Sequence, residues 1–281
     1  MPDAPPFAPR IALASLSGES DAAWARAVAD HVGCAFLGGI ALDEPTRAAA
    51  REMVTDRDRE EFLPADPHAF LDRELAALAD APLRPAFNVR AASPEPLTTA
   101  AATCARHDAI LEVNAHCRQD EMCEAGAGQS LLHDPDRLVD QVRAARGTGA
   151  TVSLKCRTEV PGVDLPAVCS RAHDAGAGVL HVDAMDSEGV VAEVVATCPN
   201  AFVVANNGVR ERRTVREYLA YGADAVSVGR PSDRPAVLRR VRAAVEAWVD
   251  GESAGSRVDA DESATDAPPT AAPDGRGGGS R

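Results

Sequence analysis

The only lysine of this sequence stands at the end of an apolar segment, and it is the first residue that suggests chemistry. Lys155 lies in "TVSLKCRTEV", residues 151–160, and the other 28 of the 29 basic residues are arginine. An ammonium group is a compact charge, whereas the guanidinium group is a wide planar fork that fits a buried spot poorly. A lysine at a strand end can also form a Schiff base with a carbonyl substrate, as in aldolase-type barrels.

Polar side chains also stand at the ends of nearly all the remaining apolar segments of the chain. In chain order they are Ser15, Ser17, Asn88, Arg90, Asn114, His116, Cys117, Arg157, His181, Asp183, Asn206, Asn207 and Arg230. Any single one of them could be a helix cap or a solvated strand end. Their recurrence from segment to segment predicts instead that they meet at one site.

The elements that would position these residues alternate between short apolar runs and amphipathic helical stretches. Eight strand-plus-helix units occupy residues 10–249, with an extra helical insertion after the second strand. This pattern predicts an α/β fold, a (β/α)₈ TIM barrel of parallel strands, with its site at the carboxyl ends of the strands. A doubly wound open sheet is the alternative, but no G-x-G-x-x-G sequence follows the first strand.

The two ends of the chain differ in composition from the barrel. Residues 1–9 are expected to form a flexible leader, and residues 250–281, acidic and rich in Gly, Pro, Ser and Ala, a disordered tail. No signal peptide is evident, and no run approaches the roughly 18 apolar residues of a membrane span. Seven cysteines without repeated spacing indicate reduced thiols, so we expect a cytoplasmic protein.

The net charge of -14 and the preference for arginine suggest adaptation to high salt, a halophilic habitat. An acidic surface repels nucleic acid in ordinary buffer. At molar salt the Debye length falls to about 3 Å, and net charge then says little about one local patch. The acidic "DRDREEF" within residues 43–81 predicts a solvated helix face or a lid over the barrel mouth.

Two glycine-bearing loops predict a phosphate site. Asn207 and Gly208 follow the seventh predicted strand, and Gly229 and Arg230 follow the eighth. In TIM barrels these two loops often hold phosphate through backbone amides, and a guanidinium group adds a forked contact. A phosphate-binding lyase or isomerase that uses Lys155 is therefore one functional hypothesis.

Six motifs together carry a more specific resemblance. They are "ILEVNAHC", "GAGQSLL", "VSLKCR", "VLHVDAMD", "VVANNG" and "GADAVSVGR". Their order and spacing resemble those of the tRNA-dihydrouridine synthases across the whole predicted barrel. Those enzymes are FMN-dependent barrels that reduce the C5=C6 double bond of uridine in tRNA. The wider flavoprotein group includes the dihydroorotate and dihydropyrimidine dehydrogenases.

The resemblance implies a role for each matching residue. The flavin would be contacted by Ser15, Asn88, Lys155 and His181, and its phosphate by Asn207, Gly208, Gly229 and Arg230. Asn114 and Arg157 would face the substrate base, and Cys117 falls on the catalytic cysteine. The negative charge of a reduced flavin would then explain the single lysine.

The implied chemistry is hydride transfer from reduced FMN to C6 of the uracil ring and protonation of C5 by Cys117. A thiol with an ordinary pKa near 8.5 is mostly protonated at neutral pH and can donate. No metal is expected, because a cluster of His116, Cys117, Cys123 and His133 lacks the C-x-x-C pairs of zinc sites. Four other cysteines are expected to be buried and to have no catalytic role: Cys34, Cys104, Cys169 and Cys198.

Three features differ from the family and bear on partners. The chain has His116-Cys117-Arg118 where the family has Gly-Cys-Pro, and Val182-Asp183 after His181 where it has Gly-Arg-Thr. After Trp248 we expect no counterpart of the helical domain that grips tRNA. NADPH is the implied electron donor and tRNA the implied partner. A reductase of a free small molecule, or a flavin-binding barrel without turnover, stays open.

Overall fold

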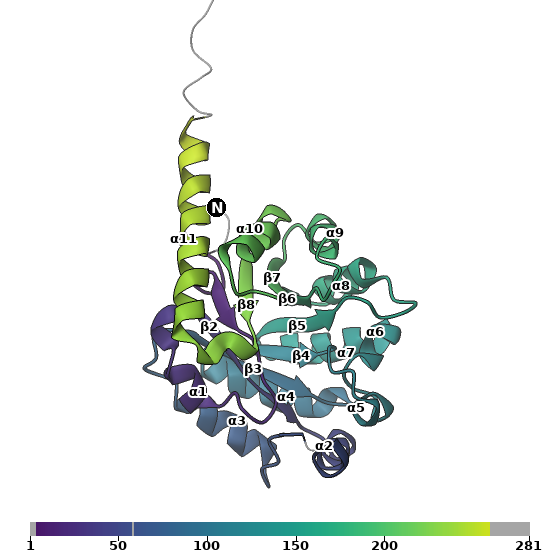
Figure 1. Cartoon of the computed structure of the whole chain (residues 1–281). Helices are drawn as coiled ribbons and strands as arrows, with labels where there is room; N and C mark the ends of the chain where they lie inside the picture. Colours follow the sequence, from purple (N-terminus) through teal and green to yellow (C-terminus); the bar gives the residue numbers. More distant parts are fainter. Residues whose placement is uncertain (1–3, 58, 259–281) are drawn as a thin grey trace, which may run out of the picture.

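Eight parallel strands close into a barrel in the computed structural model, which describes residues 4–57 and 59–258 (Figure 1). The strands are β1 (Ile11–Leu13), β2 (Cys34–Ala41), β3 (Arg84–Arg90), β4 (Ile110–Asn114), β5 (Thr151–Arg157), β6 (Ala177–Asp183), β7 (Phe202–Asn206) and β8 (Ala225–Val228). Each strand pairs with its neighbours in chain order, and β1 pairs with β8. The predicted TIM barrel is confirmed.

Helices surround the strands on the outside (Figure 1). They are α1 (Ala22–Arg26), α2 (Glu44–Arg57), α3 (Pro67–Ala76), α4 (Pro94–Arg106), α5 (Asp120–Glu124), α6 (Ser130–His133), α7 (Pro135–Arg146), α8 (Leu165–Asp174), α9 (Val190–Thr197), α10 (Arg212–Ala220) and α11 (Pro235–Val258). Two 3₁₀ turns, η1 (Ala29–His31) and η2 (Arg230–Asp233), complete the list. Both α2 and α3 lie between β2 and β3, which confirms the predicted helical insertion.

Aspartate caps explain why several helices begin where they do. The carboxylate of Asp66 accepts hydrogen bonds from two backbone amides of α3, at 2.9 and 3.0 Å. Asp134 and Asp164 cap α7 and α8 in the same way. Capping oxygens satisfy amides that have no partner within the helix, and proline is tolerated in the first turn that follows.

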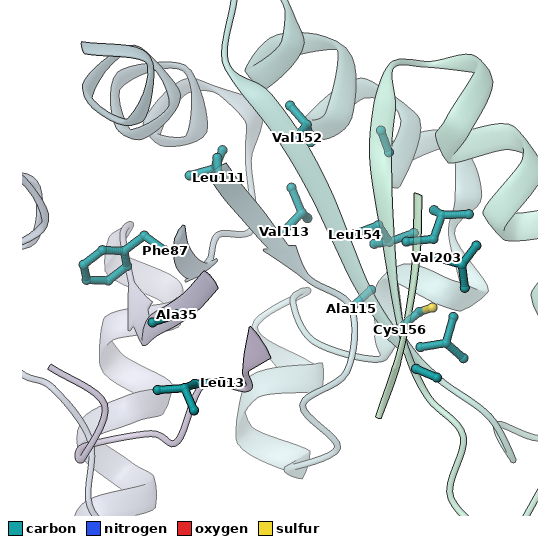
Figure 2. Packing of buried hydrophobic residues seen from close by; sticks show 14 of the residues in the cluster. Leu13, Ala35, Phe87, Leu111, Val113, Ala115, Val152, Leu154, Cys156 and Val203 are labelled. Atoms are coloured by element: carbon teal, nitrogen blue, oxygen red, sulfur yellow. The ribbon is translucent and has the colours of Figure 1, made fainter. Parts of the chain in front are cut away.

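The strands alternate between an outer apolar face and an inner face of mixed character. Outward side chains such as Leu111, Val113, Val152 and Leu154 pack against the helices in one continuous cluster (Figure 2). These residues are at most 1% exposed. Because successive strand residues point to opposite sides, the residues between them must point into the barrel.

The inner face is apolar in the lower part of the barrel, near the amino ends of the strands. A separate buried cluster there consists of Phe7, Ala12, Cys34, Phe36, Ala86, Ile110, Val179, Val204 and Ala225. Phe7 belongs to the predicted flexible leader, yet it is 4% exposed and packs edge-on against Phe202 with ring centroids 5.2 Å apart. Phe7, at least, therefore packs against the barrel within the predicted leader.

The carboxyl-terminal boundary also differs from the predicted one. The last helix, α11, continues to Val258, so residues 250–258 extend it beyond the predicted end of the barrel at 249. The rest of the predicted tail lies outside the described residues. Among the helices of the described ranges, none is long and apolar enough to cross a membrane.

Candidate active site

A cavity of about 740 Å³ opens at the carboxyl ends of the strands. Its lining includes ten of the eleven predicted site residues: Ser15, Asn88, Asn114, Cys117, Lys155, Arg157, Asn207, Gly208, Gly229 and Arg230. This volume lies within the range of about 300–1,000 Å³ that is usual for ligand pockets. The recurrence of polar strand ends therefore predicted residues that the fold does bring together.

His181 is the one predicted residue that does not line the cavity. Its side chain is fully buried one layer deeper, and its ring lies 4.9 Å from that of Phe36 between centroids. Nδ1 of His181 lies 2.7 Å from Glu112, and Nε2 lies 2.7 Å from Oγ of Ser227. Both ring nitrogens are thus occupied within the protein, so this structure gives His181 a supporting position beneath the cavity.

Glu112 is the centre of this buried layer. Its carboxylate accepts hydrogen bonds from Asn88 at 2.8 Å and from Ser153 at 3.1 Å, in addition to the contact with His181. Burial raises the pKa of Glu112, but the neighbouring His181, Lys155 and Asn88 outweigh it, and the net direction is downward. A buried carboxylate with several donors rigidifies the groups around it. Glu112 therefore orients Asn88 and His181 under the cavity floor.

Lys155 lies at this floor, where the charges of Glu112 and Asp183 act on it from beyond ion-pair distance. The residue is 5% exposed, and Nζ donates to Oγ of Ser15 at 3.3 Å. Within residues 4–57 and 59–258, no carboxylate oxygen lies within 4 Å of Nζ. A buried ammonium group without a paired anion costs free energy. The arrangement therefore indicates a place for a negatively charged ligand.

Asn114 holds the loop that carries Cys117. Its Oδ1 accepts the backbone amides of His116 at 3.0 Å and of Cys117 at 2.9 Å, and its Nδ2 donates to Asn88 at 2.8 Å. Both ends of the Asn114 amide are therefore used within the protein. Asn114 was predicted to face the substrate base, and the contacts found are with the cysteine loop and Asn88.

A buried arginine lies beside the cysteine. Arg90 is 1% exposed and is the last residue of β3. Burial lowers the pKa of its guanidinium group, but Glu61 and Cys117, which both contact it, give a net upward direction. Glu61 comes from "DRDREEF", and Glu60 of the same stretch lines the cavity. Residues 59–61 of this stretch therefore lie at one side of the mouth.

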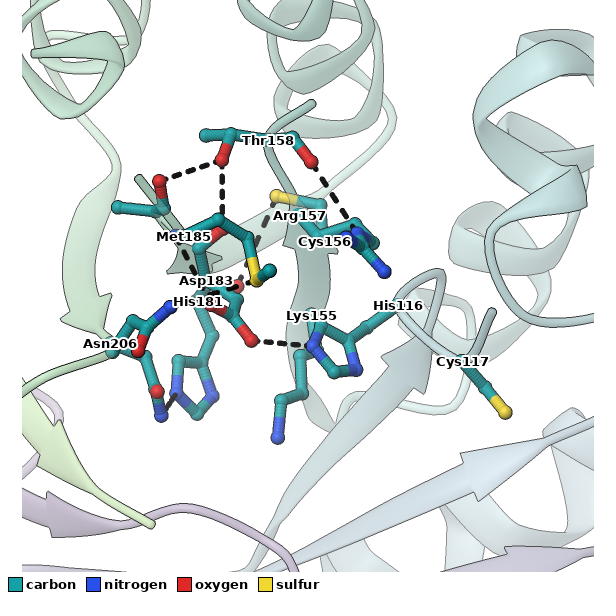
Figure 3. A network of polar contacts seen from close by, with 12 residues as sticks. His116, Cys117, Lys155, Cys156, Arg157, Thr158, His181, Asp183, Met185 and Asn206 are labelled. Atoms are coloured by element: carbon teal, nitrogen blue, oxygen red, sulfur yellow. Dashed lines mark hydrogen bonds and ion pairs between the residues drawn. The ribbon is translucent and has the colours of Figure 1, made fainter. Parts of the chain in front are cut away.

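A histidine–aspartate pair lies on the other side of the mouth (Figure 3). Nε2 of His116 lies 2.6 Å from Oδ2 of Asp183. Burial raises the pKa of Asp183, but the hydrogen bond and charge of His116, an amide of Met185 and the charge of Lys155 lower it to about 2. Burial is also the largest influence on the pKa of His116, and it lowers that pKa. The pair therefore combines an ionised carboxylate with a neutral imidazole at neutral pH.

The two glycine-bearing loops form the far end of the cavity. Asn207 and Gly208 both have positive φ, 95° and 64°, which turns their backbone sharply after β7. A Cβ atom at Gly229 would meet no other atom within 4 Å, so open space lies beside this backbone. Arg230 follows directly and is exposed. These features suit the close approach of an anionic group to the backbone.

Several functional residues had no clear signal in the sequence. Glu112 could have been found, because a lone carboxylate inside the apolar "ILEVN" strand is unusual. Glu61 has no such signal, because it lies in an acidic stretch that resembles a solvated surface. The described residues contain no group of three His, Cys, Asp or Glu side chains arranged to hold a metal ion. Cys34, Cys104, Cys169 and Cys198 are buried, as predicted.

The residues present fit a flavin mononucleotide. Lys155 offers an unpaired ammonium group at the floor, the β7 and β8 loops offer open backbone and Arg230 at one end, and the cavity is large enough. A reduced flavin carries negative charge on its ring and a phosphate on its tail. Both ends of the cavity therefore carry a positive charge, Lys155 at the floor and Arg230 at the far end, as such an anionic ligand requires.

Comparison with known proteins also points to a flavin-dependent family. The dihydrouridine synthase family matches residues 44–257. An uncharacterized protein of Methanocaldococcus jannaschii is 27% identical over 233 residues, which are 79% of this chain and 88% of that protein. DHODH from Eimeria tenella, solved in complex with ferulenol, matches with a TM-score of 0.65 and 13% identity, over 87% of this chain and 82% of that chain.

A chain of the tryptophan synthase complex from Pyrococcus furiosus also matches, with a TM-score of 0.52 and 12% identity, over 85% of this chain and 97% of that chain. At such low identity the two solved structures show the barrel fold alone. The family match spans most of the barrel and every cavity-lining segment except the loop after β1, which carries Ser15. This chain therefore belongs to the dihydrouridine synthase family, and with it to the flavin-dependent oxidoreductases.

Proposed function

We propose that this protein is an FMN-dependent reductase of the dihydrouridine synthase type, acting on the C5=C6 double bond of uridine in tRNA. The observation that carries the proposal is Lys155, a buried ammonium group at the cavity floor with no carboxylate oxygen within 4 Å in the described part of the chain. Family membership supplies the reaction class. When bound, the flavin supplies the hydride.

The chain's own residues hold the cofactor in this proposal. Lys155 and Ser15 bind the charged edge of the ring, and Asn88, fixed by Glu112, lies beside them. The backbone of Asn207 and Gly208, with Gly229 and Arg230, binds the phosphate. The positive φ values of the first loop support this role, because they direct successive amides toward the same side.

Cys117 holds the proton that C5 of the uracil ring receives. Its backbone amide is fixed by Asn114, and its side chain contacts Arg90. Arg157, 7% exposed and at the end of β5, contributes a cation to the same cavity. It would orient the carbonyl oxygens of a uracil ring. Positioned proton donors of this kind contribute about 10²–10⁴-fold to a rate.

Arginines in the cavity and on the neighbouring helix α10 support an RNA substrate, because guanidinium groups pair with phosphate. Arg210 lines the cavity, and Arg212 and Arg216 are exposed on the neighbouring α10. Phosphate groups of nucleic acid pair with such arginines even where the whole protein is acidic. We propose NADPH as the reductant, reaching the same mouth.

The first test is a visible spectrum of the protein purified in high salt, followed by anaerobic addition of NADPH. Bands near 375 and 450 nm that bleach on reduction are expected of a bound flavin. Incubation of the reduced protein with an unmodified tRNA transcript should then add two hydrogen atoms to a uridine, as read by mass spectrometry. A colourless protein that takes up no FMN would overturn the proposal, and borohydride trapping would test Lys155 as a Schiff-base residue.

A further inference from the structure

The pair of His116 and Asp183 has no role in the function proposed above, although both side chains line the cavity. His116 follows β4 and Asp183 ends β6, so the pair bridges above β5, the strand of Lys155. The two side chains are 30% and 15% exposed, and their closest atoms lie 2.6 Å apart. The contact is therefore a well-formed hydrogen bond at the edge of the site rather than a surface ion pair.

The carboxylate determines which imidazole nitrogen carries the hydrogen. An ionised carboxylate only accepts hydrogen bonds, so Nε2 of His116 must be the protonated nitrogen. When the ring is neutral, Nδ1 then has a free lone pair. The described part of the chain provides no hydrogen-bond partner for Nδ1, and this atom is not sealed from solvent. A third group that fixes the tautomer of a histidine is the usual arrangement in proton-transfer sites.

The charges around the ring favour its neutral form. Burial has the largest influence and lowers the pKa of His116, and the cations Lys155 and Arg157 of β5 act in the same direction. Asp183 of β6 opposes them through its hydrogen bond and charge, but the net direction is downward. At neutral pH the ring is therefore mostly neutral, and Nδ1 is available as an acceptor.

Cys117, the residue next to His116, is directed elsewhere. The thiol contacts Arg90 of β3, and Figure 3 shows its sulfur pointing away from the His116–Asp183 pair. The charge of Lys155, in contrast, acts on both members of the pair. The cavity thus has two groups able to exchange a proton, one on each side.

We propose that His116, oriented by Asp183, is a second proton-transfer residue of this site, with Nδ1 as the exchanging atom. The inference rests on the proposed reduction of a carbon–carbon double bond. The reduction takes up one proton besides the hydride, so Cys117 and His116 are alternative donors of it, with His116 the faster and Cys117 the slower. When His116 donates, the N–H bond at Nδ1 of the imidazolium breaks. The π electrons of the double bond form a C–H bond at the carbon next to the one that receives hydride. His116 recovers its proton from water, and in the reverse direction neutral Nδ1 takes the proton.

The kinetic test mixes the flavin-loaded, pre-reduced protein with an unmodified tRNA transcript and follows the return of flavin absorbance. His116→Asn should slow this step by about 100-fold or more, within the range of general acid–base effects. The matched control is His107→Asn. His107 also contacts an aspartate, Asp72 at 2.8 Å, but lies on the outer helices. The control should react at the wild-type rate.

The pH profile separates proton transfer from a structural role. The wild-type rate should fall as the pH rises through the pKa of His116, because only the imidazolium donates. Asp183→Asn removes a group that raises this pKa, so the falling limb should move to lower pH. A rate for His116→Asn within twofold of wild type, with an unchanged pH profile, would overturn the proposal.

A second measurement is independent of activity. Long-range ¹⁵N–¹H NMR of wild-type protein reports the tautomer of each imidazole, and His116→Gln assigns the signal. We expect the neutral Nε2–H form at pH 7.5, with a mixed population in Asp183→Asn. A charged ring or an Nδ1–H form would overturn the dyad. Wild-type protein that binds flavin but is not reoxidised by tRNA would instead contradict the substrate proposed above.

Discussion

The lower and upper parts of the barrel interior are built from the same strands but from opposite kinds of residue. The lower part is filled by apolar side chains such as Phe36 and Ile110, with Phe7 inserted from the amino-terminal segment. Two residues further along three of these strands, the interior carries Asn88 after Ala86, Glu112 after Ile110 and His181 after Val179. The barrel is therefore a packed core at one end and a charged site at the other.

The two parts contribute to the free energy of folding in different ways. Burying a large apolar side chain stabilises the folded state by about 1.5–3 kcal/mol. A buried charged network roughly balances its own desolvation, although removing one member leaves the others unpaired. The lower part therefore supplies most of the stability, and this stability keeps the polar groups of the upper part in fixed positions. Substitutions in the two parts should therefore affect stability and ligand binding differently.

The largest effect is expected from Glu112→Ala in the upper part. The change leaves Asn88, Ser153 and His181 without their shared acceptor, and removal of one member of a buried charged network costs about 3–5 kcal/mol. Urea unfolding would measure the loss. Glu95→Ala, at an exposed position in the first turn of α4, is the control and should change stability by less than about 0.5 kcal/mol. A loss below about 1 kcal/mol for Glu112→Ala would show that water replaces the carboxylate.

The lower part should respond to Phe7→Ala with a loss of about 3 kcal/mol, at the low end for a buried phenylalanine. The ring is 4% exposed and fills the amino-terminal end of the barrel. Because the cavity lies at the opposite end, flavin affinity should stay within twofold of wild type. Denaturation and a flavin titration on the same preparation would check both statements. An unchanged stability would mean that the amino-terminal segment does not fill the barrel in solution.

Acidification should weaken the upper part through Asp183. Its folded pKa of about 2 lies below the usual value of 3.8, so this carboxylate stabilises the folded state above about pH 4, and the contribution is lost as the pH falls toward 2. The shift corresponds to about 2 kcal/mol. Asp183→Asn should therefore be less stable than wild type by about this amount at pH 7, with the gap narrowing at pH 3 and closing only near pH 2. Asp72→Asn, whose partner is His107 on the surface, should show almost no gap.

The smallest effect on stability is expected from Lys155→Met. The lysine is buried without a paired carboxylate, so an apolar side chain of similar length should leave stability unchanged or raise it by about 1 kcal/mol. Flavin affinity should fall at least tenfold. A variant that loses stability while it keeps its affinity for the flavin would reverse the assignment of this residue from ligand binding to folding.

The sequence predicted the barrel well because its signals are periodic. Eight apolar runs and the Asp-Pro starts of α3 and α7 are local features, and each one locates an element without knowledge of the rest. Lys155 and Asn88 were predictable for a related reason. They end strands, and all strand ends of a parallel barrel lie on one side.

The features that the sequence did not reveal depend on contacts between distant residues. Glu61 pairs with Arg90 across 29 positions, and nothing in an acidic stretch indicates that one of its carboxylates is buried. The depth of His181 depends on the stagger between neighbouring strands, which strand ends alone do not reveal. Phe7 looked like part of a loose leader because its partner, Phe202, is on β7.

The contact of Phe7 with Phe202, and the pairing of β1 with β8, also matter for synthesis of the chain. Of the eight barrel strands, β1 is synthesised first, and it gains its second neighbour only when residues 225–228 have emerged. Until then it has an unpaired edge, and the phenylalanine ring has no cavity to fill. The nascent barrel therefore exposes an apolar strand edge at β1 until β8 has been synthesised. Translation stalled before β8 should make it a substrate for chaperones that bind exposed apolar segments.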